Sequence, residues 1–159
     1  MLDRLAGDNG LSGGKRQLVS PERHAAKIKA VRDTAQKFGI HLFINARTDP
    51  FPLKLGWPDE CLNEAARRAK AYADAGADGI FVPGLTDLAL IEKFVQFTPL
   101  PVNIMVMQCG PEIPDLARVG VRRVSLGPWP MMAAMRVIGQ AAAAVAASKQ
   151  YGTFLQPNA

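Results

Sequence analysis

Residues 42–49 read Leu-Phe-Ile-Asn-Ala-Arg-Thr-Asp, and this stretch is the strongest guide to the fold. A short apolar run, too short for a helix, is followed at once by polar and charged residues. That pattern is typical of a buried parallel strand that delivers polar side chains at its carboxyl end. In α/β proteins this end of the strand is where ligands bind and catalytic groups are placed. The stretch therefore predicts a strand with a site at its end.

Arg47 is the first candidate residue, and our prediction for a catalytic role rests on it alone. Its guanidinium offers a planar fork of donors that matches a carboxylate or a phosphate. A second interpretation is that Arg47 and Asp49 form a structural ion pair at the end of the strand. The strand by itself leaves both interpretations open.

Helices and strands are expected to alternate along the chain. Ser20-Pro21-Glu22 is a typical helix start, with an N-cap, a proline at the first position and an acid in the first turn. Capping residues, apolar periodicity and helix breakers place the remaining helices in the same way. Helices are expected from Ser20 to Gly39, from Asp59 to Gly76, from Thr86 or Asp87 to Pro99, from about Glu112 to Val119 and from Pro130 to about Lys149. Strands are expected at 42–45, 78–84, 102–107 and 121–126.

Three glycines, Gly39, Gly76 and Gly120, each come shortly before an expected strand. Glycine is favoured just after a helix end, where the backbone takes a positive φ. Four strands alternating with helices predict a parallel α/β arrangement with right-handed crossovers. Periodicity alone allows either a small doubly wound sheet or half of an eight-stranded barrel.

Parallel strands bring their carboxyl ends to one face, so the polar residues near those ends are candidates for a binding site. The face combines a cation, amide donors, a hydroxyl and glycine-rich turns, which suits a small carboxylate or phosphate. Asn103 has a second interpretation, because an inward amide can simply cross-link neighbouring strands. Carboxylates are too sparse here to suggest a hard cation, so no metal ligands are assigned. The substrate-binding candidates are Asn45, Arg47, Asn103, Ser125 and Gly127.

Length and charge narrow the possible functions. The chain has 159 residues, about the size of one domain, and a formal net charge of +5, which suits small anionic ligands. Basic residues are scattered without interleaved aromatics, so no nucleic-acid partner is expected. Cys61 and Cys109 lack the spacing of a zinc site, and Cys61 is expected to be a packing residue. His24 is expected to be a surface or capping residue.

No leader peptide and no apolar run of transmembrane length is expected, which favours a cytoplasmic protein without a membrane partner. The alanine-rich residues 140–147 are expected in a packed helix. Gly13-Gly14-Lys15 lacks the full Walker spacing, so residues 1–19 are expected to form a polar loop. One partial-barrel domain is expected over residues 1–159, with residues 151–159 as a tail.

Four segments resemble the isocitrate lyase/phosphoenolpyruvate mutase superfamily, and the 2-methylisocitrate lyase-like branch in particular. They are Phe43–Asp49, Ala75–Gly84, Leu100–Asn103 and Gly120–Gly127, in the family's order. The resemblance implies the C-terminal half of a (β/α)8 barrel that uses Mg²⁺ to hold a 2-oxo acid or its enolate. It also implies that Arg47 binds the substrate carboxylate or phosphonate, that Asn103 faces the same pocket, and that Ser125 and Gly127 line it.

Two positions differ from the family's pattern. Leu2 stands where a glutamate is usual, which leaves only Asp3, and Pro83 replaces the glutamate of the lyases. Three hypotheses follow: a Mg²⁺-dependent lyase that is incomplete in this truncated chain, a non-catalytic anion-binding half-barrel, or a phosphonate-handling mutase or hydrolase. A half-barrel also leaves two strand edges open, which predicts a homo-oligomer.

Overall fold

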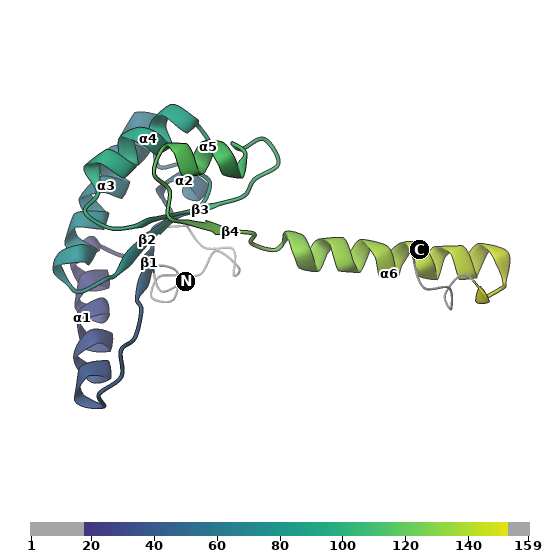
Figure 1. Ribbon diagram of the computed structural model, residues 1–159, viewed down its shortest axis with the longest axis horizontal. Helices are drawn as coiled ribbons and strands as arrows, with labels where there is room; N and C mark the ends of the chain where they lie inside the picture. The colour runs from purple at the N-terminus through teal and green to yellow at the C-terminus, as the bar shows by residue number, and fades with distance from the viewer. Residues whose placement is uncertain (1–17, 153–159) are drawn as a thin grey trace. The chain divides into compact units, whose positions relative to one another are not determined.

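The computed structural model describes residues 18–152, which fall into two compact units divided after Ser125. In the first unit, helices and strands alternate as predicted (Figure 1). Its strands are β1 (Asn45–Arg47), β2 (Gly79–Val82), β3 (Val102–Met105) and β4 (Arg123–Ser125). Its helices are α1 (Pro21–Lys37), α2 (Pro50–Leu53), α3 (Pro58–Asp74), α4 (Leu88–Phe97) and α5 (Ile113–Arg118). The second unit contains α6 (Trp129–Ser148).

All four strands are parallel and pair in the order β1-β2-β3-β4. Strands that follow one another in the chain are therefore neighbours in the sheet, and each of β2, β3 and β4 is reached by a crossover that contains at least one helix. Neither β1 nor β4 has a second strand beside it among the described residues. This sequential order is that of a barrel segment and differs from the reversed order of a doubly wound sheet.

The first strand begins three residues later than predicted, at Asn45 instead of Leu42. Leu42 lies beyond the ladder, and its carbonyl accepts a hydrogen bond from Arg32 Nη1 at 2.8 Å. The Ile44 N–H donates to the Asp78 carboxylate at 2.7 Å, and Asp78 also pairs with Arg32. Hydrogen bonds from side chains therefore hold residues 42–44, which lie outside the paired strand. The apolar run predicted a start of the strand that was three residues too early.

Local sequence signals predicted the starts of α1 and α4 correctly. The Ser20 hydroxyl accepts a hydrogen bond from the Arg23 N–H at 3.3 Å, and the Asp87 carboxylate accepts one from the Leu90 N–H at 3.0 Å. Both residues are N-caps, as predicted. The three glycines before the strands have φ of 67°, 95° and 91°, in the left-handed region that favours glycine (Gly39, Gly76 and Gly120).

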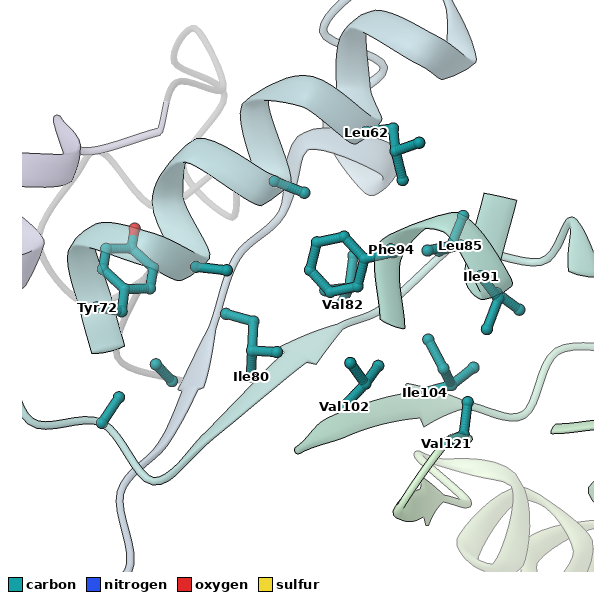
Figure 2. Close-up of a cluster of buried hydrophobic side chains, with 14 of the residues drawn as sticks. Leu62, Tyr72, Ile80, Val82, Leu85, Ile91, Phe94, Val102, Ile104 and Val121 are labelled. Carbon is teal, nitrogen blue, oxygen red and sulfur yellow. The ribbon is translucent and has the colours of Figure 1, made fainter. Parts of the chain in front are cut away.

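The hydrophobic core lies on one face of the sheet. Figure 2 shows Tyr72 of α3 and Phe94 of α4 among the buried side chains of β2 and β3. Helices α1 and α5 contribute Ile28 and Leu116 to the same cluster. Alternate strand residues supply the sheet side of this core and are almost fully buried: Ala46, Ile80, Val82, Val102 and Ile104. Helices therefore cover this face, and the strand residues that alternate with these five point to the other one.

His24 is fully buried, so the expectation of a surface or capping residue is wrong. Its ring lies edge-on to Tyr72 with the centroids 4.8 Å apart, between α1 and α3. Burial, with smaller effects from the nearby Lys27 and Arg68 charges, lowers the pKa of His24 to about 4. The imidazole is therefore neutral near pH 7. Polar residues in the first turn of the helix suggested exposure, but α3 covers this position.

Arg68 is buried beside His24, and its guanidinium group is hydrogen-bonded to three neighbouring residues. It donates hydrogen bonds to Glu64, to the Val19 carbonyl and to the Tyr72 hydroxyl. Burial alone would raise the pKa of Glu64, but hydrogen bonds from Arg67 and Arg68 outweigh it and lower the pKa. Cys61 is buried, as expected for a packing residue, and burial raises the pKa of its thiol.

Helix α6 is long and apolar, and none of its residues is buried. The expectation that residues 140–147 lie in a packed helix stays a prediction, because α6 belongs to the second unit. Within residues 18–152, α6 is also the one helix whose length and composition would let it cross a membrane. The core helices of soluble proteins pass the same test, and Arg136 lies within the apolar stretch of α6.

Candidate functional site

Arg47 is the last residue of β1 and points to the face of the sheet that the helices leave uncovered. Its Nε donates to Asp49 Oδ1 at 2.7 Å, and its Nη2 lies 2.7 Å from the same oxygen. The guanidinium carbon lies 5.5 Å from the centre of the Phe81 ring on β2. An ion pair and a cation–π contact together fix the orientation of the arginine.

The ion pair leaves part of Arg47 available. Asp49 occupies the Nε–Nη2 side of the guanidinium, so the Nη1 group and one Nη2 hydrogen stay at its far end. These remaining donors can bind a carboxylate or phosphate end-on. The two interpretations of Arg47 from sequence are therefore compatible, because the pair with Asp49 positions the group that would bind the ligand.

Asn103 of β3 and Ser125 of β4 form a second polar pair on the same face. The Ser125 hydroxyl donates to Asn103 Oδ1 at 3.0 Å. Asn103 is 2% exposed, and its Nδ2 is buried with no hydrogen-bond partner among the described residues. A buried donor without a partner is unfavourable by about 1–3 kcal/mol. An acceptor supplied by a ligand would relieve that penalty.

Asn45 lies across the neighbouring strand. Its Oδ1 is 3.1 Å from the position that a Cβ would occupy on Gly79, and the Phe43 ring is 3.3 Å from the same point. Gly79 is the register partner of Asn45 on β2. The absence of a side chain at Gly79 therefore lets Asn45 rest on the sheet.

The pairing register places Arg47 and Asn103 in one row across the sheet. Arg47 is opposite Phe81, Phe81 is opposite Asn103, and Asn103 is opposite Arg123. Residues in one row point to the same face. Four of the five predicted binding residues, Asn45, Arg47, Asn103 and Ser125, therefore share one face. Gly127 belongs to the second unit and has a φ of 59°.

Sequence reasoning missed Phe81 and Arg123. Phe81 was considered only as part of an apolar strand, yet it lies beside Arg47 and separates it from Asn103. Arg123 is exposed and forms no ion pair with the described residues. The alternation of β4 could have found it, because Val124 packs on the core and Arg123 must then point the other way.

Residues 18–152 contain no group of three His, Cys, Asp or Glu side chains that could hold a metal ion. The carboxylate nearest to Arg47 is that of Asp49, and it is bound to the arginine. Mg²⁺ prefers several oxygen ligands, so the described residues do not fit a magnesium site. The groups that gather on the uncovered face are instead mainly donors, which suits an anion.

Four parallel β/α units in sequential order, with polar groups on the face opposite the helices, have the architecture of half a (β/α)8 barrel. A family model described as phosphoenolpyruvate phosphomutase matches residues 6–146. The chain belongs to this family and so to the phosphoenolpyruvate mutase/isocitrate lyase superfamily.

Two relatives illustrate the range of the family. The uncharacterized protein Rv1998c of Mycobacterium tuberculosis is 34% identical over 145 residues, which cover 91% of this chain and 53% of that protein. Oxaloacetate decarboxylase of Ectopseudomonas mendocina is 34% identical over 122 residues, covering 75% of this chain and 39% of the enzyme. The chain thus spans about half the length, or less, of the curated relatives that it matches.

Solved structures give the same picture. A protein from Burkholderia cenocepacia, whose name assigns it provisionally to the phosphonomutases, is 37% identical with a TM-score of 0.79. The match covers 93% of this chain and 56% of that one. A 2,3-dimethylmalate lyase, 22% identical with a TM-score of 0.74, shares the fold over 85% of this chain and 47% of its own. The predicted fold class is confirmed: four β/α units that match half of the superfamily's barrel.

Proposed function

We propose that this chain is the substrate-binding half of a lyase that cleaves a C–C bond in a 2-methylisocitrate or 2-oxo acid type of substrate. The buried, unpaired Nδ2 of Asn103, in the same row as Arg47, is the observation that carries the proposal. Both groups are donors, so their ligand must supply acceptors. Oxaloacetate decarboxylase and 2-methylisocitrate lyase, the latter 34% identical over 95 residues in Bacillus subtilis, act on carboxylic acids by name.

Each residue has a separate task in this proposal. The far end of the Arg47 guanidinium binds a substrate carboxylate, and Asp49 keeps the guanidinium in place. Asn103 donates from Nδ2 to the substrate oxygen that gains negative charge as the C–C bond breaks. Ser125 donates to Asn103 Oδ1, which turns Nδ2 rather than the carbonyl oxygen toward the ligand. Asn45 is proposed to complete the lining, whereas Gly127 lies in the second unit and its role stays a prediction from the sequence.

Members of the superfamily typically use Mg²⁺, which stabilises an enolate oxygen when bound. The described residues do not fit this ion, so its ligands would have to come from outside residues 18–152. We therefore expect ligand binding by this chain, but no cleavage by this chain alone. We also propose a cytoplasmic location and association into a homo-oligomer.

Phosphonate chemistry is the second candidate. It is favoured by the family model and by the name of the Burkholderia cenocepacia protein. A phosphonate and a carboxylate both supply acceptors to Arg47, so the geometry of the site fits either. Pro83 directly follows β2 and cannot take up a proton as an acid at that position could, and this favours a third, non-catalytic anion-binding role for the chain alone.

Calorimetric titration with oxalate and with methylphosphonate tests the proposal. We expect oxalate to bind more tightly, and Arg47→Met to reduce its affinity at least tenfold. Arg118→Met is the matched control, because Arg118 is an exposed arginine on α5 that pairs with Asp115 of the same helix. Failure of the unmodified chain to bind either anion would refute the proposal. Tighter binding of methylphosphonate would favour the second candidate.

A turnover assay separates the lyase from the non-catalytic module. The chain is incubated with 2-methylisocitrate and Mg²⁺, alone and together with the part of the Burkholderia cenocepacia protein that it does not match. We expect cleavage only in the combined sample. Oxalate binding without turnover in the combined sample would support the non-catalytic role.

A further inference from the structure

Arg123 of β4 is a second arginine on the uncovered face of the sheet, and the proposed function does not use it. Val124, the next residue, packs against the hydrophobic core, so Arg123 points to the opposite face. The pairing of β4 with β3 fixes this position, because Asn103 and Arg123 are register partners. Arg123 therefore lies next to the buried amide whose Nδ2 lacks a partner.

The charge of Arg123 is not neutralised by the described residues. Its side chain is exposed and forms no ion pair or hydrogen bond with residues 18–152. Arg47, in contrast, lies 2.7 Å from the Asp49 carboxylate, which balances its charge. Among the strand residues described on this face, the unbalanced positive charge therefore lies on β4, three strands away from Arg47.

The residues of the row change in chemistry from one strand to the next. Both ends of the row are cations, and an aromatic ring and an amide donor lie between them: Arg47, Phe81, Asn103 and Arg123. A ligand that lies along the row is complementary to it when each end of the ligand is anionic. Such a ligand would place an apolar segment beside Phe81 and an acceptor oxygen beside Asn103.

The strand spacing indicates how far apart the two anionic groups would be. The guanidinium carbon of Arg47 lies 5.5 Å from the centre of the Phe81 ring, so the cation of β1 extends toward β2. Two strand spacings, about 10 Å in all, separate β2 from β4. The long side chain of Arg123 can extend across part of this distance. The two anionic groups would therefore be separated by several bonds, unlike the carboxylates of oxalate, which are joined directly.

We propose that Arg123 is a specificity-determining residue that binds a second anionic group of the ligand. This inference rests on the proposed function, in which Arg47 binds the first anionic group. It assigns to the chain a preference for acids with a charged group at each end, such as succinate and glutarate, over acids with one. A hydrogen bond from an arginine to a carboxylate is about twice as strong as one between neutral groups, so the second contact would select strongly.

Calorimetric titration of the 159-residue chain with matched pairs of acids tests this role. Succinate and butyrate have the same number of carbons and differ in the second carboxylate, as do glutarate and valerate. We expect each dicarboxylate to bind at least tenfold more tightly than its monocarboxylate, and more tightly than oxalate. Arg123→Met should reduce each ratio to threefold or less and change the affinity for the monocarboxylates by less than twofold.

Arg122→Met is the matched control, because it removes the same charge from the adjacent exposed residue, whose side chain alternates to the other side of the sheet. This variant should keep both ratios. Equal loss in the two variants would attribute the preference to overall charge and would overturn the proposal. Far-UV circular dichroism verifies folding, and Arg123→Gln, which keeps a polar side chain without the charge, provides a second test with the same expected loss.

The outcomes separate this inference from the proposed function. If Arg47→Met weakens the binding of every acid but the ratios survive in Arg123→Met and Arg123→Gln, the proposed function stands and the role of Arg123 is refuted. If the unmodified chain binds the dicarboxylates no better than the monocarboxylates, the role of Arg123 is refuted as well. If the unmodified chain binds none of these acids, both proposals are refuted.

Discussion

The two faces of the sheet differ in almost every physical respect. On the helix-covered face, alternate strand residues are apolar and nearly fully buried, and four helices share one core with them. On the uncovered face the same strands carry Arg47, Asn103 and Arg123, and a buried donor there lacks a partner. The first face is complete within one chain, whereas the second requires something from outside. Stability should therefore depend mainly on the first face and binding on the second.

The largest effect should come from the covered face. Phe94 is fully buried in the core (Figure 2), so Phe94→Ala should lower the free energy of unfolding by about 3–5 kcal/mol. Phe97→Ala, three residues along the same helix, should change it by less than about 0.5 kcal/mol. Urea unfolding followed by circular dichroism measures both. Similar values for the two variants would show that this face is not the main source of stability.

Acid should weaken the layer of helices behind that face. The pKa of His24 is about 4 in the folded chain, against the ordinary histidine value of 6.5, so the unfolded chain binds more protons between these values. Its contribution to stability is complete above pH 6.5 and declines as the pH falls toward 4, by about 3 kcal/mol in total. Comparison with His24→Gln, titrated in parallel by urea unfolding, isolates this contribution. An unchanged difference between the two proteins from pH 7 to pH 4 would contradict the prediction.

On the uncovered face, a substitution should change ligand affinity more than the free energy of unfolding. Asn103→Leu keeps the approximate shape of the side chain but removes the Nδ2 donors. We expect the affinity for oxalate to fall at least tenfold, which corresponds to about 1.4 kcal/mol. The free energy of unfolding should change by about 1 kcal/mol or less, because the substitution removes a buried donor without a partner among the described residues and Ser125 is only partly buried. Calorimetry and urea unfolding on one preparation give both values, and a large loss of stability with intact binding would reverse the assignment of the faces.

The smallest effect is expected at Gly79. A Cβ there would lie 3.1 Å from Asn45 Oδ1, so Gly79→Ala should displace the Asn45 side chain by a few tenths of an ångström. We expect a two- to threefold weaker affinity for oxalate and little change in stability, because its φ is not in the left-handed region. Gly84→Ala is a contrasting control, since its φ of 79° should make that variant less stable. Unchanged oxalate binding in Gly79→Ala would remove Asn45 from the site.

Much of the fold was predictable because its signals are local. Ser20 and Asp87 carry their caps in their own side chains, and the glycines before the strands mark backbone that other residues avoid. The order of helices and strands follows from such signals and implies a parallel sheet. The ends of β1 were not predictable in this way, because the ladder begins only where Gly79 lies opposite Asn45. The burial of His24 depends likewise on α3, which comes more than thirty residues later.

The sequence by itself determined which chemical groups could gather at the strand ends: an arginine with a nearby acid, amides and a hydroxyl. Only the tertiary structure decided which of them share a face. Pairing register places Arg47, Phe81, Asn103 and Arg123 in one row, although they come from four separate strands of the chain.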